Sequence, residues 1–134
     1  MRKALVPQRV RTISGSFAAI EHRFLRHGFW ATLGHHELLL YFFLILVADR
    51  QGLSFYSYDK ICSLLVISVD DYILARDSLI DKDLLAFDGT FFQVLSLPPE
   101  PVRRSRLLQD KEDMTREDPA TIYRLMKQDL RRRT

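Results

Sequence analysis

Five arginine side chains that could bind phosphate groups lie on either side of the middle of the chain. They are Arg9, Arg11, Arg103, Arg104 and Arg106. A guanidinium group suits phosphate because its fork of N–H donors can bond two phosphate oxygens at once. The numbers of basic (Lys plus Arg) and acidic (Asp plus Glu) residues are six and one in residues 1–27, four and ten in residues 28–100, and ten and six in residues 101–134. An acidic middle (net −6) therefore separates two basic flanks (net +5 and +4), a distribution that bears on binding partners more than on fold.

The residues offer little support for catalytic or metal chemistry. The chain contains neither of the glycine-rich phosphate-loop patterns, GxxxxGK[ST] and GxGxxG. The segment HHELLL at His35–Leu40 lacks the second histidine of HExxH, and the four histidines with Cys62 do not have zinc-finger spacing. We therefore expect no enzyme activity, no cofactor, no metal and no small-molecule substrate.

The chain carries no pattern typical of export or membrane insertion. Its basic N-terminus is not followed by an apolar run, and its most apolar stretch, Leu38–Ala48, would form a helix of only about 16 Å, half of a bilayer core. The single cysteine, Cys62, lies in an apolar segment and is expected to be a buried thiol. These features predict a cytoplasmic protein without a membrane segment.

The elements that would position the charged residues begin with an unusually apolar helix. Its predicted range is Glu37–Arg50, ended by Gly52, and its apolar side chains point in every direction. Such a helix must be covered all round, by the N-terminal segment, a C-terminal helix or a second subunit. Before it we expect a short strand at Phe17–Ile20 and a short helix at Glu21–His27, and after it a strand at Leu53–Ser57.

Two further helices and a hairpin are predicted next. Ser57 could cap a helix that runs to Leu65, and Ser68 with Asp71 resembles a capping box that opens a helix over about residues 69–82. Asp88-Gly89 between two β-prone runs predicts a tight hairpin whose two central residues have positive φ. The PPEP segment at residues 98–101 ends this part of the chain.

A last helix is predicted over residues 119–133, with Asp118 as its N-cap and Pro119 at its first position. One face carries an apolar stripe that could fold back on residues 37–50 or pair with a second copy of the chain. The stripe consists of Ile122, Tyr123, Met126 and Leu130, which we take as a candidate oligomer interface.

The segment ADRQGLSFYSYDKICSLLVISVDDYILARDSLIDKDLLAFDGTFFQVL resembles winged helix-turn-helix domains of phage and plasmid replication initiators and of small GntR-type and MarR-type bacterial regulators. The matching positions are Ala48–Gly52, Ser68, Leu79, Lys82 and Leu84. The resemblance implies a mainly α fold with a small β-hairpin (α+β) and a winged-helix domain at residues 34–98. A basic N-terminal extension, residues 1–33, would precede this domain, and a linker with the basic helix, residues 99–134, would follow it.

In such families the second helix of the turn motif enters the major groove and the wing contacts the backbone or minor groove. The resemblance therefore implies double-stranded DNA as a partner, with base-side contacts from the first turns of that helix and phosphate contacts from the flanking arginines. The candidate contact residues are Ser68, Asp70, Asp71, Leu74, Arg9, Arg11, Arg103, Arg104 and Arg106. The expected function is a transcriptional regulator or a replication or mobile-element accessory factor.

A second hypothesis comes from the charges of the same surface. The outer helix face is expected to carry four aspartates, Asp70, Asp71, Asp77 and Asp81, with Lys82 as the only cation, and the wing tip has none. Aspartates next to phosphates repel, although one can accept from cytosine N4. The alternative is a winged-helix module for protein interaction, either a homodimer or an adaptor for a basic partner.

Arg76 allows two interpretations. It falls within the apolar stripe of the predicted helix, where it could pair with Glu37, Asp49 or Asp59 at the edge of the core. The other interpretation rotates the helix so that Arg76 faces nucleic acid.

Overall fold

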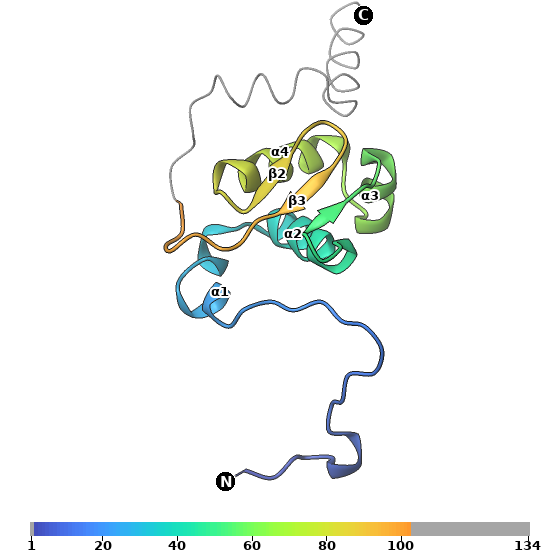
Figure 1. Ribbon diagram of the computed structural model, residues 1–134, viewed down its shortest axis with the longest axis vertical. Coiled ribbons are helices and arrows are strands. Elements are labelled where there is room, and N and C mark those ends of the chain that lie inside the picture. The colour runs from blue at the N-terminus through green and yellow to red at the C-terminus, as the bar shows by residue number, and fades with distance from the viewer. Residues whose placement is uncertain (1, 103–134) are drawn as a thin grey trace, which may run out of the picture.

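The computed structural model describes residues 2–102 (Figure 1). In chain order the elements are a 3-10 helix η1 (Pro7–Arg9), α1 (Arg23–Arg26), a 3-10 helix η2 (Trp30–Thr32), α2 (His35–Val47), β1 (Leu53–Ser54), α3 (Tyr58–Leu65), α4 (Val69–Asp81), β2 (Leu85–Phe87) and β3 (Phe92–Val94). The predicted α+β class, mainly helical with a small sheet, is confirmed. The predicted helix 119–133 with its stripe, and Arg103, Arg104 and Arg106, lie outside the described residues.

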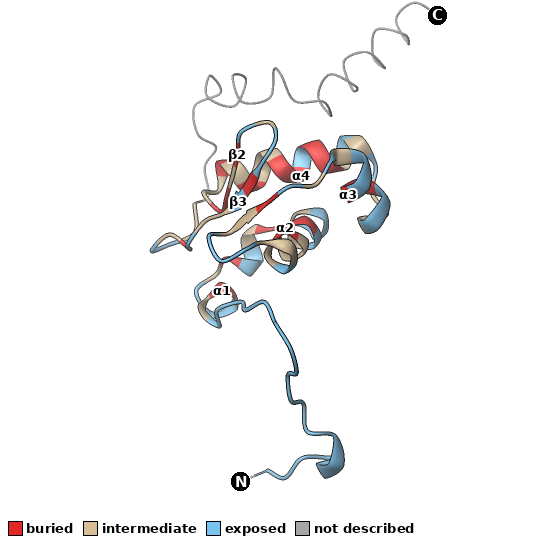
Figure 2. Ribbon diagram, turned by 45° about the vertical axis from the view of Figure 1, so that its right-hand side comes forward, coloured by how far each residue is buried: buried red, intermediate tan, exposed pale blue. Residues whose placement is uncertain are grey.

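The three strands form one antiparallel sheet in the order β1-β3-β2. Leu53 pairs with Gln93 across β1 and β3, and Phe87 pairs with Phe92 across the hairpin. Helix α2 packs on α4, and both helices turn their buried sides toward the sheet and toward each other (Figure 2). The hairpin therefore closes the core on one side while α3 and α4 form a bent pair beside it (Figure 1).

The hairpin lies where it was predicted, but the turn type was wrong. The connection is the four-residue loop 88–91. Asp88 does not have a positive φ, because in the described residues Val66 and Asp83 are the only non-glycine residues that do. The Asp88 carboxylate accepts hydrogen bonds from the backbone N–H groups of Phe91 (2.6 Å) and Thr90 (2.8 Å), and these bonds hold its pKa below the usual value. Aspartate stabilises the loop through its side chain, so only Gly89, at φ +97°, needs left-handed backbone.

The packed core begins before residue 34. Phe24, Phe29 and Leu33 are buried in the same cluster as Leu40 and Leu44 of α2. The Phe24 ring stacks on Phe29 (6.1 Å between centroids) and on Tyr41 (5.2 Å). Residues 21–33 are thus part of the body of the protein, and the basic extension proper is shorter than residues 1–33.

Arg23 connects this N-terminal part to the other end of the described chain. Its guanidinium donates to the carbonyl oxygens of Leu97 (2.8 Å) and Pro98 (3.0 Å), and it lies over the Phe29 ring. The residues that follow β3, up to Pro98, are consequently held against α1, and the arm leaves the body on this side.

The strand predicted at Phe17–Ile20 is absent, and these residues are exposed and irregular. The β-prone side chains there have no neighbouring strand with which to pair, and a strand without a partner is not stable in water. Helix α2 also ends at Val47 instead of Arg50. Asp49 accepts from the backbone N–H groups of Gln51 and Leu53, which favours a turn over helix continuation at this point.

Helix α2 is not covered on every side by the described residues. Leu40, Tyr41 and Leu44 are buried, but Leu39 and Leu46 are exposed. The prediction that the N-terminal segment helps to cover this helix is confirmed at one place, where Phe42 contacts the rings of Phe24 and Trp30. In the part of the chain that the structure describes, every helix is too short or too polar to cross a membrane.

Candidate functional site

The α3–α4 turn was predicted correctly and Ser68 has a structural role in it. Helix α3 ends with Val66 in the left-handed region (φ 56°), and the Ile67 N–H closes the turn on the Cys62 carbonyl at 3.1 Å. The Ser68 hydroxyl accepts from the Asp71 backbone N–H at 3.0 Å. The hydroxyl oxygen thus caps α4 as an acceptor, and its O–H remains able to donate to a DNA phosphate.

Apolar side chains protrude from this turn into solvent. We call the surface formed by Leu64, Val66, Asp70, Asp71 and Leu74 the turn face. The side chains of Leu64 and Leu74 are more than half exposed, and Val66 is 88% exposed. A β-branched residue in left-handed backbone is strained, and this one gains no packing within the described residues. These exposed apolar side chains on α3, α4 and the turn between them offer a surface to which another molecule could bind.

The acidic part of the outer face is smaller than predicted. Asp70 is exposed and Asp71 is partly exposed, with His36 Nε2 3.9 Å from its carboxylate. Asp77 is mostly buried beside Arg76, and Asp81 is buried, so the prediction of an exposed Asp81 was wrong. The chain turns back after α4, with the Leu84 N–H bonded to the Leu79 carbonyl, and the following strand covers this end of the helix.

Arg76 is fully buried and does not face a nucleic acid. Its Nε and Nη2 atoms lie 3.1 Å and 3.0 Å from Asp77 Oδ1, and its guanidinium lies over the rings of Tyr72 (5.5 Å) and Phe87 (5.2 Å). Arg76 therefore stabilises the contact between α4 and the hairpin, through a carboxylate and two aromatic faces. The interpretation as a paired core arginine is supported, and Asp77, which was not among the carboxylates expected from the sequence, is an ion-pair partner.

Lys82, the one cation expected on the outer face, is bound elsewhere. Its Nζ lies 2.9 Å from Glu37 Oε2 and also donates to the Thr32 carbonyl. Burial opposes ionisation of Glu37, but hydrogen bonds from Ser78, Lys82 and the Gly34 N–H, with the charge of Lys82, outweigh burial and lower the Glu37 pKa. This pair joins the start of α2 to the end of α4.

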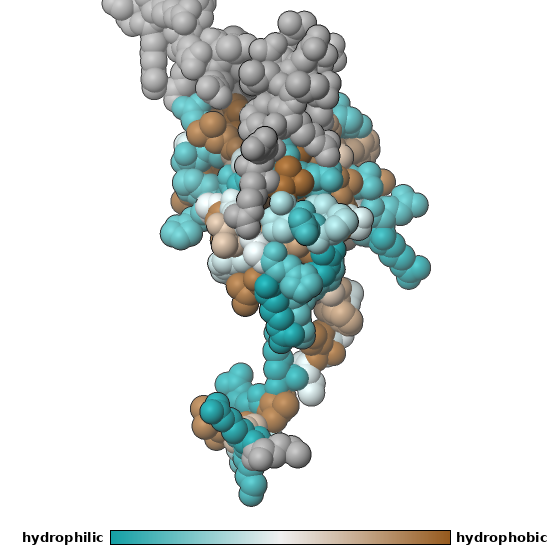
Figure 3. All heavy atoms as spheres, turned by 90° about the vertical axis from the view of Figure 1, so that its left-hand side faces the viewer, coloured by the Kyte–Doolittle hydropathy of each residue, from teal (hydrophilic) through white to brown (hydrophobic). Residues whose placement is uncertain are grey.

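The exposed cations consequently lie away from α4. From α3 to β3 the sequence has three cations, Lys60, Arg76 and Lys82, and only Lys60 is exposed. We call residues 2–20 the arm: all are exposed, and they carry Arg2, Lys3, Arg9 and Arg11 without an acidic residue. The arm leaves the body next to α1, on the opposite side from α4 (Figure 1), and extends from it as a narrow segment of mixed polar and apolar residues (Figure 3). The structure thus does not bring Arg9 and Arg11 next to Asp70, Asp71 and Leu74.

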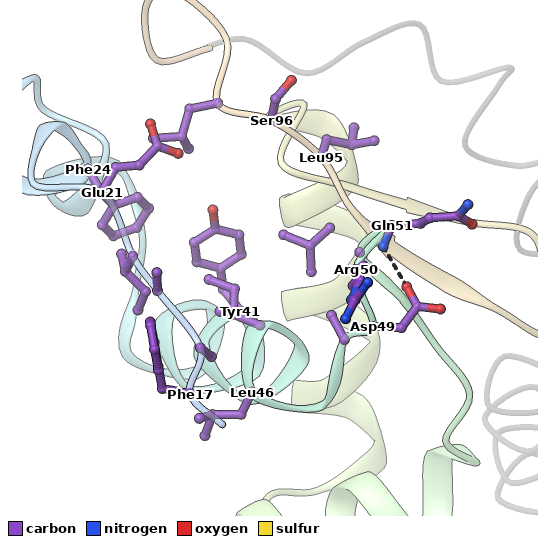
Figure 4. Close-up of a pocket in the computed structure, with 18 of the residues that line it drawn as sticks. Phe17, Glu21, Phe24, Tyr41, Leu46, Asp49, Arg50, Gln51, Leu95 and Ser96 are labelled. Atoms are coloured by element: carbon purple, nitrogen blue, oxygen red, sulfur yellow. Dashed lines mark hydrogen bonds between the residues drawn. The ribbon is translucent and has the colours of Figure 1, made fainter. Parts of the chain in front are cut away.

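A hollow of about 650 Å³ lies between the arm and the body. It is bounded by residues 16–21, by α2, by the loop 48–52 and by residues 94–97, with the Tyr41 ring between the two walls (Figure 4). Burial raises the pKa of Tyr41 to about 12, so its phenol stays protonated near neutral pH. The Asp49 carboxylate is occupied by the backbone N–H groups of Gln51 and Leu53. In this lining we find no pairing of a nucleophile with a base.

Two features of the site were not indicated by the sequence pattern. Val66 is the last residue of the apolar run ICSLLV and was expected only to lie in the turn before Ser68, and its left-handed conformation is one that normally indicates glycine. The ion pair between Glu37 and Lys82 joins residues 45 positions apart, which pattern analysis cannot detect.

Comparisons with known proteins identify no relative of this chain. No protein-family model matches it, and neither a curated protein nor a solved structure shows significant similarity to it. Within residues 2–102 no group of three or more His, Cys, Asp or Glu side chains is placed to hold a metal ion.

Proposed function

We propose that this chain is a winged-helix DNA-binding accessory protein that holds duplex phosphates with its basic arm and uses the turn face to dock protein. The observation that carries the proposal is the separation of charge: four exposed cations and no acid on the arm, and exposed acidic and apolar residues on α4. Phosphate binding depends on exposed Lys and Arg, and in the described residues the arm has the largest group of them.

The order of elements supports the winged-helix part of the proposal. Helix α2 is followed by a short strand, two helices joined by a tight turn, and a hairpin, and β1 pairs with the second hairpin strand. This is the arrangement expected of a helix-turn-helix with one wing. The main contacts to DNA would differ from those expected from the family resemblance, because Asp70 and Asp71 are anionic and Leu74 offers only apolar contact. On this basis we propose a role in transcription, replication or element mobility.

The proposal is tested by the salt dependence of binding to a short duplex. Each phosphate contact contributes about −0.9 to the slope of log K against log salt concentration. Replacement of both Arg9 and Arg11 by Gln should therefore make this slope less negative by about 2. The matched control neutralises two exposed cations of the body, Arg50→Gln with Lys60→Gln. We expect the control to bind like the wild type, and equal losses in both double variants would contradict a role for the arm.

A second variant tests whether α4 enters the groove. If Asp70 and Asp71 accept hydrogen bonds from cytosine, Asp70→Asn with Asp71→Asn should weaken binding to the duplex. Under our proposal the same change removes repulsion, and binding stays equal or becomes tighter. Weaker binding by this variant, with unchanged binding by the arm variant, would overturn the proposed contact.

A protein-docking module without DNA affinity is the second candidate. The observation that favours it is the strained, 88% exposed Val66 between two exposed leucines, since an apolar patch is unsuited to phosphates. Absence of any duplex binding at low salt, with the fold intact, would favour this candidate over the first.

A further inference from the structure

We propose that the turn face is covered by the C-terminal segment of the same chain, residues 119–133, bound as an amphipathic helix antiparallel to α4. This inference identifies the partner of the docking surface and rests on that part of the proposed function.

The turn face has the composition that such a helix needs. Leu64, Val66 and Leu74 present apolar area, and Asp70 and Asp71 lie one turn N-terminal to Leu74 on α4. Residues three and four apart lie on one side of a helix, so the two acids and Leu74 share a face. A partner for this surface should have an apolar stripe next to several cations.

The C-terminal segment carries both features in its sequence. Residues 119–133 contain five cations and one acid, a net charge of +4, whereas residues 103–118 contain five cations and five acids, a net charge of zero. The positive charge of the C-terminal part is therefore concentrated where the apolar stripe of Ile122, Tyr123, Met126 and Leu130 is found. Charge complementarity to the acidic body favours binding within the chain.

The lengths also fit. Helix α4 has 13 residues, about 20 Å, and a helix over residues 119–133 would be about 22 Å long. The Leu95 N–H bonds the Leu84 carbonyl at 3.1 Å, so the chain leaves the sheet near the end of α4. The intervening residues 103–118 reach up to about 50 Å when extended, more than twice the length of α4. A helix that starts near the end of α4 and runs back along it places Arg131, Arg132 and Arg133 next to Asp70 and Asp71.

Cross-linking of the full-length protein tests this arrangement. In a Cys62→Ala background, Leu74→Cys with Met126→Cys places one thiol on the turn face and one on the C-terminal stripe. The matched control is Leu46→Cys with Met126→Cys, because Leu46 is exposed on α2. With a short bismaleimide we expect the intramolecular product of the first pair to exceed that of the control at least about fivefold, because docking raises the local thiol concentration.

Charge dependence provides the second readout. The double variant Asp70→Lys with Asp71→Lys should reduce the cross-link yield of the first pair to the level of the control. About 0.5 M salt should do the same, because at that concentration charges more than a few ångströms apart are screened from one another. Thermal unfolding of each variant verifies that the fold is retained. Equal yields from both pairs, a higher yield from the Leu46 pair, or a product that is mainly a cross-linked dimer would each overturn the proposal. No DNA is present in this experiment. Docking of the C-terminal segment can therefore be refuted while DNA binding by the arm is supported, and DNA binding can be refuted while docking is supported.

Discussion

The ion pair between Glu37 and Lys82 should be a major contributor to the packing of α2 on α4. The two charged atoms are 2.9 Å apart, and the side chains are 18% and 21% exposed. Glu37 also accepts from the Gly34 N–H at 2.9 Å and so caps the start of α2. Removal of either partner would leave the other charge in a partly buried position.

The size of the effect follows from this burial. Exposed ion pairs contribute about 0–1 kcal/mol, and loss of one partner of a fully buried pair costs about 3–5 kcal/mol. At about one fifth exposure we expect Glu37→Gln and Lys82→Met each to lower the free energy of unfolding by about 2 kcal/mol, with a coupling of about 1–2 kcal/mol between them.

Urea denaturation of the wild type, both single variants and the double variant at pH 7 measures this coupling. The control cycle uses the pair Glu21–Arg23, whose atoms are 3.0 Å apart but whose side chains are 58% and 31% exposed. Its coupling should be below about 0.5 kcal/mol, because solvent screens exposed charges. Equal coupling energies in the two cycles would refute the argument from burial.

The pH dependence checks the same pair independently. The folded-state pKa of Glu37 is lowered from 4.5, so its contribution is present above that value and is lost as the pH falls through the folded-state pKa. The stability difference between wild type and Glu37→Gln should therefore shrink on acidification below about pH 4.5. A difference that stays constant between pH 7 and pH 3 would contradict the assignment.

Two backbone predictions follow from positive φ angles. Val66→Gly removes a left-handed strain of about 1–2 kcal/mol but raises the entropic cost of folding by about 0.5–1 kcal/mol. The free energy of unfolding, measured in urea, should therefore rise slightly. The control Val66→Ala should give no such rise. Gly52→Ala places a Cβ 2.5 Å from the Val94 carbonyl oxygen at φ +84° and should destabilise by about 2 kcal/mol or more. Gly89→Ala is the matched control, because Gly89 has a similar φ of +97° but its added Cβ would meet no atom within 4 Å, and it should lower the free energy of unfolding by about 1 kcal/mol. Equal losses of stability at the two glycines would contradict the argument from the Val94 contact.

The order of helices and the hairpin could be predicted from local signals. Ser68 capping α4, Gly28 with positive φ after α1, and the hairpin at Asp88-Gly89 depend on residues close in sequence, and the structure has each of them. The end of α2 and the absent strand at residues 17–20 were missed because they depend on competing bonds and on pairing partners. Local propensity does not contain that information.

The candidate site was less predictable than the fold. The helical wheel placed Asp77 and Asp81 in solvent, but the buried guanidinium of Arg76 and the return of the chain toward β2 enclose that end of α4. Lys82 was expected to be exposed and instead binds Glu37. In each case a contact between residues distant in sequence, or the packing of a neighbouring element, decided where the side chain lies.

The attachment of Arg23 to the carbonyl groups of Leu97 and Pro98 has a consequence for affinity. It fixes the end of the arm and the residues after β3 to one corner of the body, within a few positions of Arg103, Arg104 and Arg106 in sequence. If both segments bind a polyanion as proposed, their attachment at one point makes binding bivalent, because binding of one holds the other at an effective concentration of about millimolar. Avidity of this kind would allow a protein with few cations on its body to remain bound to a long polyanion at moderate salt.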